Sequence, residues 1–250
     1  MKTPLATLAL ATLLSAATPS VAAQDTFSVI VFDAATGELA SAGASCIDGD
    51  AAPGGARIIS SVLPGVGAVH TQSFYVPANQ RLAERLLAAG FAAERLLDSV
   101  RAADRTRSDA LRQYAAVTLA PTFSLTGFTG ASCMPYAGHH VGADYVAAGN
   151  ILLDSLVLAR MVAALESSRD GGQSAGQRAL AALQAVAYPG ADRRCLDAGL
   201  SSRSAFLRVA RPGDEAEALS VDAVVEFPEG GRDPIDLLAG RVAGLLGAPR

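Results

Sequence analysis

The stretch TFSVIVFDAATGELASAGAS, residues 26–45, has the pattern of a β-hairpin. Apolar side chains alternate along residues 26–33, which is the period of a strand whose two faces meet different layers. Residues 33–38 read as the turn, because Gly37 is free to adopt a positive φ. Residues 39–45 return as a second strand of very small side chains, which predicts close packing of another layer against it.

The residues before this hairpin read as a secretory signal peptide. Lys2 supplies a positive charge, residues 5–17 are apolar and uncharged, and small residues at 21–23 match a cleavage site. The apolar run is shorter than a membrane-spanning helix. Cleavage after position 23 would leave a mature protein that starts two residues before Thr26 and is exported to the periplasm or the exterior.

The rest of the chain predicts groups of strands that alternate with pairs of helices. Strands are predicted at residues 57–63, 66–73, 114–119, 123–129, 139–151 (interrupted by glycines), 203–210 and 218–226. Helices are predicted at residues 77–89, 92–103, 153–167, 177–187 and 233–246, with Leu82, Leu86 and Leu87 on the apolar face of the first. This order differs from regular βαβ alternation and favours antiparallel sheets covered by helices. We therefore expect one α+β domain over residues 24–250.

The composition excludes several classes of protein. Half of the residues are hydrophobic but only 5% are aromatic, and the formal net charge is -4. Such a chain has enough apolar residues for a core, so disorder is not expected. A mildly acidic protein without a basic tract does not suit binding to nucleic acid. No apolar run after residue 23 reaches membrane-spanning length, so no membrane span is predicted.

Three cysteines, Cys46, Cys133 and Cys195, are present. In an exported protein they predict one disulfide and one remaining thiol, with three pairings open. The alternative is three buried thiols.

The sequence predicts neither a metal site nor a cofactor. The histidines, His70, His139 and His140, have no partner ligand at zinc-finger spacing. Gly65 and Gly67 are not followed by a helix, so they do not form a nucleotide-binding loop.

Thr26 is the first candidate for a catalytic residue. A hydroxyl residue at a free amino terminus can be activated by its own α-amine, whose pKa near 8 makes it a usable base. The alternative is an ordinary strand threonine. The catalytic interpretation requires that Gln24 and Asp25 be removed first.

Three further polar residues are candidates for the site, and the first of them, His70, lies near the end of a predicted strand. His70 could act as a general base, or it could be a hydrogen-bonded structural histidine. Asp192 and Arg193 precede the last cysteine, where an arginine could bind a carboxylate. The alternative is a solvated loop.

The densest polar cluster is the glycine-rich segment 127–150. Cys133, His139 and Asn150 could form the catalytic triad of a Cys–His–Asn hydrolase. They are close in sequence, however, whereas the residues of such triads usually come from distant segments. We expect Cys133 to be oxidised instead.

Several short segments, in order along the chain, resemble the domain of unknown function 1028 family. They are Thr26–Ile30, Asp33–Glu38, Pro64–Val69, Phe128–Gly130, Ala137–His139, Gly149–Leu152 and Gly190–Arg194. The resemblance covers residues 26 to about 240. It implies an Ntn-hydrolase-like fold, a four-layer αββα sandwich of two antiparallel sheets between helices. The three cysteines look like features of an exported branch of the family, which favours a disulfide between two of them. By analogy with related folds, the resemblance also suggests a homo-oligomer.

The resemblance also implies an amide-bond hydrolase with an N-terminal nucleophile, and only Thr26 carries over to that role. In this interpretation the amides near Gly130 or the side chain of Asn150 would hold the oxyanion, and His70 would orient the substrate. His139, Asp192 and Arg193 would line the site for a small-molecule or peptide substrate.

Two other functions remain open on the sequence. One is a non-catalytic exported module that binds a peptide, glycan or cell-wall fragment in the same cleft. The other is a secreted structural or adhesion domain, which predicts an exposed apolar patch.

Overall fold

The centre of the molecule consists of two antiparallel β-sheets. The structure is a computed structural model that describes residues 26–106, 108–227 and 229–247, so the predicted leader at 1–23 lies outside the described residues. The six-stranded sheet has the order β10 (Val221–Val225), β9 (Ser204–Ala210), β2 (Glu38–Ser45), β1 (Phe27–Asp33), β8 (Tyr145–Gly149) and β7 (Gly138–Val141). The four-stranded sheet has the order β3 (Ser60–Leu63), β4 (Gly67–Gln72), β5 (Gln113–Thr118) and β6 (Ser124–Thr129).

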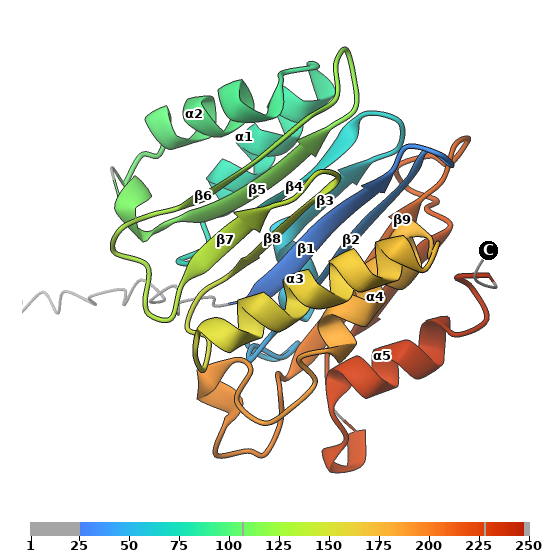
Figure 1. Ribbon diagram of the computed structural model, residues 1–250. Helices are drawn as coiled ribbons and strands as arrows, with labels where there is room; N and C mark the ends of the chain where they lie inside the picture. Colours follow the sequence, from blue (N-terminus) through green and yellow to red (C-terminus); the bar gives the residue numbers. More distant parts are fainter. Residues whose placement is uncertain (1–25, 107, 228, 248–250) are drawn as a thin grey trace, which may run out of the picture.

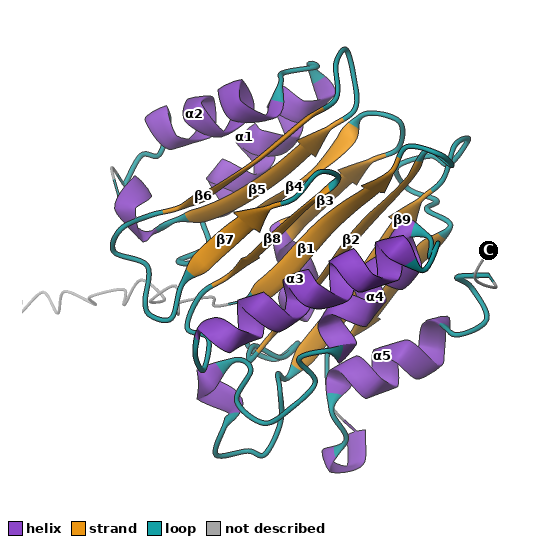
Figure 2. Cartoon of the chain, in the orientation of Figure 1, coloured by secondary structure: helices purple, strands orange, loops and turns teal. Residues whose placement is uncertain are grey.

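Helices cover the outer face of each sheet (Figure 1). The four-stranded sheet carries α1 (Pro77–Ala88) and α2 (Ala93–Ala102); the six-stranded sheet carries α3 (Ser155–Asp170), α4 (Ala175–Gln184) and α5 (Pro234–Val242). Short 3-10 helices are η1 (Gly55–Ile59), η2 (Asp109–Leu111), η3 (Arg193–Cys195) and η4 (Glu229–Gly231). The strands therefore lie between two helical layers (Figure 2). The prediction of an α+β protein with two antiparallel sheets is confirmed.

The alternation in β1 sends its side chains to two different cores. Phe27, Val29 and Val31 belong to the cluster under α3, α4 and α5. Ile30 belongs to the cluster between the sheets, and Ser28 points to the same side. The inter-sheet space thus has an apolar part around Ile30 and a polar part around Ser28.

The small residues of β2 also leave room for a large ring within its own sheet. A Cβ atom on Gly43 would lie 2.8 Å from the ring of Phe206 on the neighbouring strand. The hairpin turn uses Gly37 at a φ of 72°, and β1 and β2 pair from Phe27↔Ala44 onward.

Two predicted strands differ in the structure. The segment 57–63 begins as η1, because Gly54 takes a φ of 93° and the N–H of Arg57 donates to its carbonyl in a 3-10 turn. The segment 139–151 is a hairpin, β7 and β8, that turns at Gly142, whose N–H donates to Tyr145.

The inner face of α1 is more polar than its leucine pattern predicted. Leu87 is buried, but Leu82 and Leu86 are only partly covered. Asn79 and Gln80 are buried instead, because they hydrogen-bond to side chains of the sheet beneath.

One disulfide joins Cys46 and Cys195, whose Cα atoms lie 5.7 Å apart. A disulfide was predicted and is confirmed. The expectation that Cys133 is oxidised was wrong, because its Sγ donates to the carbonyl of Arg112 at 3.3 Å and the other two cysteines pair with each other.

Candidate functional site

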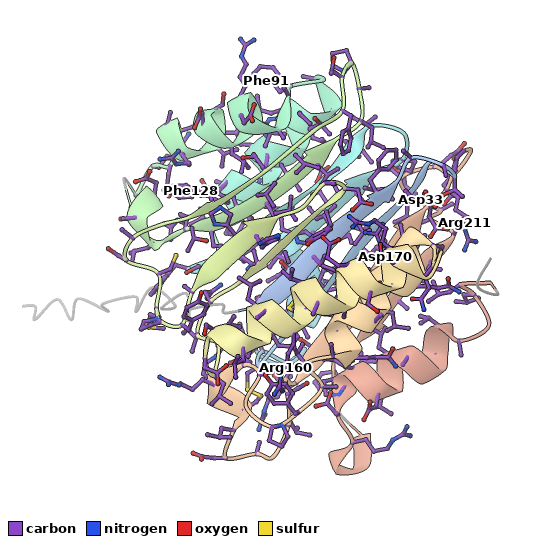
Figure 3. All side chains as sticks on the ribbon, viewed as in Figure 1. Asp33, Phe91, Phe128, Arg160, Asp170 and Arg211 are labelled. Atoms are coloured by element: carbon purple, nitrogen blue, oxygen red, sulfur yellow. A yellow bond between two sulfur atoms is a disulfide. The ribbon has the colours of Figure 1, made fainter. Side chains whose placement is uncertain are left out.

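Thr26 lies at the head of β1, in the middle of the six-stranded sheet. It is 1% exposed, and its carbonyl accepts hydrogen bonds from the backbone N–H of Asn150 and from Nε2 of Gln72, both at 3.2 Å. Asp33, the last residue of β1, lies at the other end of the sheet (Figure 3). Neighbours from both sheets therefore fix the backbone at the Thr26 end.

From this end a row of buried polar side chains crosses the space between the sheets. We call it the polar row, and its members are Asn150, Gln113, Gln72, Ser28, His70, Ser41 and Ser60. Six of the seven are at most 1% exposed, and Ser60 is 9% exposed. Because a buried polar group without a partner is costly, such a continuous row fixes the register of the two sheets against each other.

The direction of the hydrogen bonds around His70 follows from its partners. Burial, with a smaller contribution from the charge of Arg208, lowers the pKa of His70 to about 3, so the imidazole is neutral and carries one proton. Ser28 donates its hydroxyl proton to Gln72 at 2.7 Å, and therefore accepts from Nδ1 of His70 at 3.0 Å. Nε2 is then the acceptor for the hydroxyl of Ser41 at 2.7 Å.

The amides at the Thr26 end also have a defined orientation. Nε2 of Gln113 donates to the carbonyls of Gly138 and Gly149, each at 2.9 Å, so Oε1 is the atom that accepts from Gln72 and from Nδ2 of Asn150. Oδ1 of Asn150 is then left buried without a partner among the described residues.

A second unpaired group lies at the same end. Ser73 directly follows Gln72, has a φ of 59°, and its buried hydroxyl has no partner among the described residues. Native proteins rarely leave buried polar atoms unpaired. Two such atoms beside the head of β1 mark this end of the sandwich as the candidate site.

Two other candidate residues are Gly130, which directly follows β6, and His139, which lies on β7. The N–H of Gly130 already donates to the carbonyl of Arg112 at 2.9 Å. His139 is exposed on β7, and its Nδ1 lies 2.9 Å from the hydroxyl of Thr129. Cys133, His139 and Asn150 therefore do not form a Cys–His–Asn triad, because their side chains hydrogen-bond to Arg112, Thr129 and Gln113, respectively.

Asp192 and Arg193 lie just before Cys195, one of the two residues of the disulfide. Asp192 is 1% exposed; its carboxylate accepts from the N–H of Cys46 at 2.7 Å and pairs with Arg194 at 2.7 Å. This places Asp192 in a structural contact beside the disulfide. Arg193 is exposed, and its guanidinium reaches the carbonyl of Leu153 at 3.4 Å.

Sequence reasoning missed most of the polar row. It identified His70 and Asn150 but not Ser28, Ser41, Gln72 or Gln113. The alternation of inward and outward side chains along each strand could have indicated these residues, because each is a polar residue at an inward-facing position of a buried strand. Only the register shows that these positions meet.

Within the described residues, no helix is long and apolar enough to cross a membrane. No group of three or more His, Cys, Asp or Glu residues in the same part of the chain is arranged to hold a metal ion.

Comparison with known proteins agrees with this architecture. A crystal structure of protein SPO2555 from Silicibacter pomeroyi, itself assigned to the DUF1028 family model, has a TM-score of 0.68 and 24% sequence identity, with 90% of each chain covered. At that identity the likeness concerns the fold. No curated protein matches the chain.

The family model described as "Family of unknown function (DUF1028)" matches residues 26–235, most of the chain. The protein belongs to this family. The match begins at Thr26.

Proposed function

We propose that the protein is an exported amide-bond hydrolase in which Thr26 is the nucleophile once the residues before it have been removed. The observation that carries the proposal is the buried Oδ1 atom of Asn150, which has no partner among the described residues. Asn150 lies next to Thr26, because its backbone N–H donates to the Thr26 carbonyl. An acceptor at this position suits the ammonium form of a new α-amine on Thr26. The layered arrangement of sheets and helices, which we interpret as Ntn-hydrolase-like, supports the same function.

The reaction would begin at the Thr26 hydroxyl. Oγ1 attacks the substrate carbonyl carbon while the α-amine takes its proton, and the tetrahedral intermediate then expels the leaving amine, which receives that proton. Water hydrolyses the resulting ester and restores the hydroxyl. An α-amine with an ordinary pKa near 8 suits both proton transfers.

The hydrogen bonds around Thr26 limit which groups could stabilise the oxyanion of the tetrahedral intermediate. The N–H of Gly130 already donates to a protein acceptor, so we assign it no oxyanion role. Nδ2 of Asn150 gives one of its two protons to Gln113 and has a second to donate, and the Ser73 hydroxyl also has a proton to donate, so these two groups are our candidate oxyanion donors. His70 acts as a positioning residue through Ser28 and Gln72.

Substrate contacts are proposed for the surrounding loops. Arg193 is exposed beside the disulfide and would hold an acidic group of a small-molecule or peptide substrate. His139 is exposed on β7 and would line the same opening. Export is supported by the signal-like residues 1–23 and by the Cys46–Cys195 disulfide, which suits an oxidising compartment.

The low exposure of Thr26, 1%, favours one alternative. If Gln24 and Asp25 stay attached, Thr26 has no α-amine and the hydrolase chemistry cannot run. The protein would then be a non-catalytic exported module that binds a peptide, glycan or cell-wall fragment.

The test starts with intact mass and N-terminal sequencing of the protein from its native compartment. Two chains are then compared: one released with Thr26 as its first residue and one that starts at Gln24. We expect only the first to be acylated on Thr26 by a β-lactone probe and to hydrolyse members of a panel of acyl anilides.

Thr26→Ser and Thr26→Ala in the chain that starts at position 26 are the matched controls. Serine keeps a hydroxyl and should retain labelling, whereas alanine should lose it. Equal hydrolysis by the alanine variant and the parent would overturn the assignment, and a native terminus at Gln24 would favour the binding module.

A further inference from the structure

The four-stranded sheet is narrower than the sheet it faces. Its edge strand β3 lies over β9, and β10 extends beyond it. Along this edge is a cavity of about 370 Å³, lined by residues of η1, β3, α1, β9 and β10. That volume falls within the roughly 300–1,000 Å³ of small-molecule sites.

A second cavity of about 200 Å³ shares Ser60, Ser61, Glu84 and Arg208 with the first. It extends along β3 toward Ala216 and Glu217. We call the two together the β3 groove. It is distinct from the Thr26 end, because Ser60 is the far end of the polar row.

One wall of the β3 groove carries an excess of positive charge. Arg57 pairs with Asp222 at 3.0 Å, and Arg208 lies 3.5 Å from the other oxygen of the same carboxylate. Two guanidinium groups therefore share one carboxylate. Burial lowers the pKa of Arg208, and the nearby charge of Arg57 lowers it further. The carboxylates of Asp222 and Glu84 offset these effects only in part, so an anion bound beside the two guanidinium groups would add to the compensation of their charge.

The opposite wall, on α1, carries a fixed negative charge. The carboxylate of Glu84 accepts from the hydroxyl of Ser61 at 2.7 Å, and that hydroxyl accepts from Nε2 of Gln80 at 2.7 Å. Gln80 is in turn held by Thr71 of β4. This is the reason for the polar inner face of α1, and it preorganises the carboxylate beside the cavity.

We propose that the β3 groove binds a small zwitterion, an α-amino acid or short peptide, with its carboxylate at Arg57 and Arg208 and its ammonium group at Glu84. Opposite charges on facing walls of one cavity match a ligand that carries both charges. Hydrogen bonds already hold the Arg208 and Glu84 side chains in place: Arg208 donates to the Ser60 carbonyl at 3.0 Å, and Glu84 accepts from Ser61. Glu84 would repel a ligand that carries only negative charge, and Arg57 and Arg208 would repel a ligand that carries only positive charge.

Binding is measured by isothermal titration on the mature protein with L-alanine and L-alanyl-L-alanine as probes. N-acetyl-L-alanine lacks the ammonium group and L-alaninamide lacks the carboxylate. We expect saturable binding of at least one zwitterion and an affinity lowered about tenfold or more for each blocked probe, the usual effect of losing a charge-assisted hydrogen bond.

Variants identify the cavity. Arg57→Gln should weaken binding of the zwitterion about tenfold without affecting L-alaninamide, and Glu84→Gln should do so without affecting N-acetyl-L-alanine. Arg85→Gln, one residue along α1 but outside the cavity lining, is the matched control and should bind as the parent does.

No saturable binding of either zwitterion at millimolar concentration, equal binding of the blocked probes, or unchanged binding in both variants would each overturn the proposal. The proposal does not depend on the hydrolase reaction. The titration is therefore repeated with Thr26→Ala, which should bind the zwitterion as tightly as the parent.

Discussion

Nε2 of His70 lies 2.7 Å from the hydroxyl of Ser41, and this contact joins the two sheets at their centre. Ser41 is on β2 of one sheet and His70 is on β4 of the other. Both side chains are 0% exposed. The imidazole is held neutral here by burial, so its ionisation is coupled to folding.

We predict that His70 makes the protein acid-sensitive. Its pKa is about 3 when folded, below the ordinary 6.5, so the unfolded chain binds the extra proton between these values. His70 does not reduce the free energy of unfolding above pH 6.5. As the pH falls from 6.5 toward 3, His70 lowers this free energy by about 1.4 kcal/mol per pH unit. Urea unfolding from pH 7 to 4 should show this slope, and His70→Gln should reduce it. His140→Gln, at an exposed position, should leave it unchanged; equal slopes in all three proteins would contradict the prediction.

A buried ion pair should dominate the stability of the segment after α2. Asp104 and Arg112 lie 2.8 Å apart with side chains 1% and 5% exposed. Asp104→Asn leaves the guanidinium buried without its counter-charge, so we expect a loss of about 3–5 kcal/mol in the free energy of unfolding. Asp98→Asn, whose side chain is 73% exposed, should change it by less than about 0.5 kcal/mol. Similar losses in urea melts of both variants would show that burial does not decide the effect.

The pKa of Asp104 adds a pH signature to this pair. Burial alone would raise it, but hydrogen bonds from Thr106 and Arg112 outweigh that effect and lower it. The stabilisation is present above the ordinary pKa near 3.9 and is lost as the pH falls through the folded value. Asp104→Asn should therefore be less sensitive to pH than the parent below pH 4.

The disulfide should contribute substantially to stability. Cys46 and Cys195 are separated by 149 residues, and closing so long a loop restricts the unfolded chain. Reduction, or Cys195→Ser, should lower the free energy of unfolding by about 2–5 kcal/mol, measured by urea melts with and without reductant. Cys133→Ser leaves the disulfide in place and should still respond to reductant. A parent protein that melts identically in both conditions would contradict the prediction.

Gly67 should not tolerate a side chain. Its φ is 151°, and a Cβ atom there would lie 2.3 Å from the carbonyl oxygen of Val117 on β5. Gly67→Ala should cost at least about 3 kcal/mol or prevent folding, because backbone must move. Gly65→Ala, at a φ of 69° with open space around it, should cost only about 1 kcal/mol. Thermal melts that rank the two variants equally would be inconsistent with the packing described here.

Local features were predictable because their signals lie within a few residues. The β1–β2 hairpin follows from alternation and Gly37, and the start of α5 follows from Asp233, whose side chain accepts from the N–H of Ile235. The segment 57–63 was harder, because the backbone of Gly54 redirects the chain.

Contacts between distant segments were not predictable in this way. The sequence allowed three disulfide pairings, and the packing of the loops selected Cys46 and Cys195. Ser28 and Gln72 are 44 residues apart, and Arg57 and Asp222 are 165 apart. Each pair meets only because strand register and sheet order place it there.

By itself the sequence determined the α+β class, the antiparallel strands covered by helices and the position of Thr26 at the head of a strand, because hydrophobic period and turn residues are local signals. The tertiary structure alone decided the polar row, the unpaired oxygen of Asn150 and the facing charges of the β3 groove. The physical reason is that a buried polar side chain is defined by its partners, and those partners come from other strands.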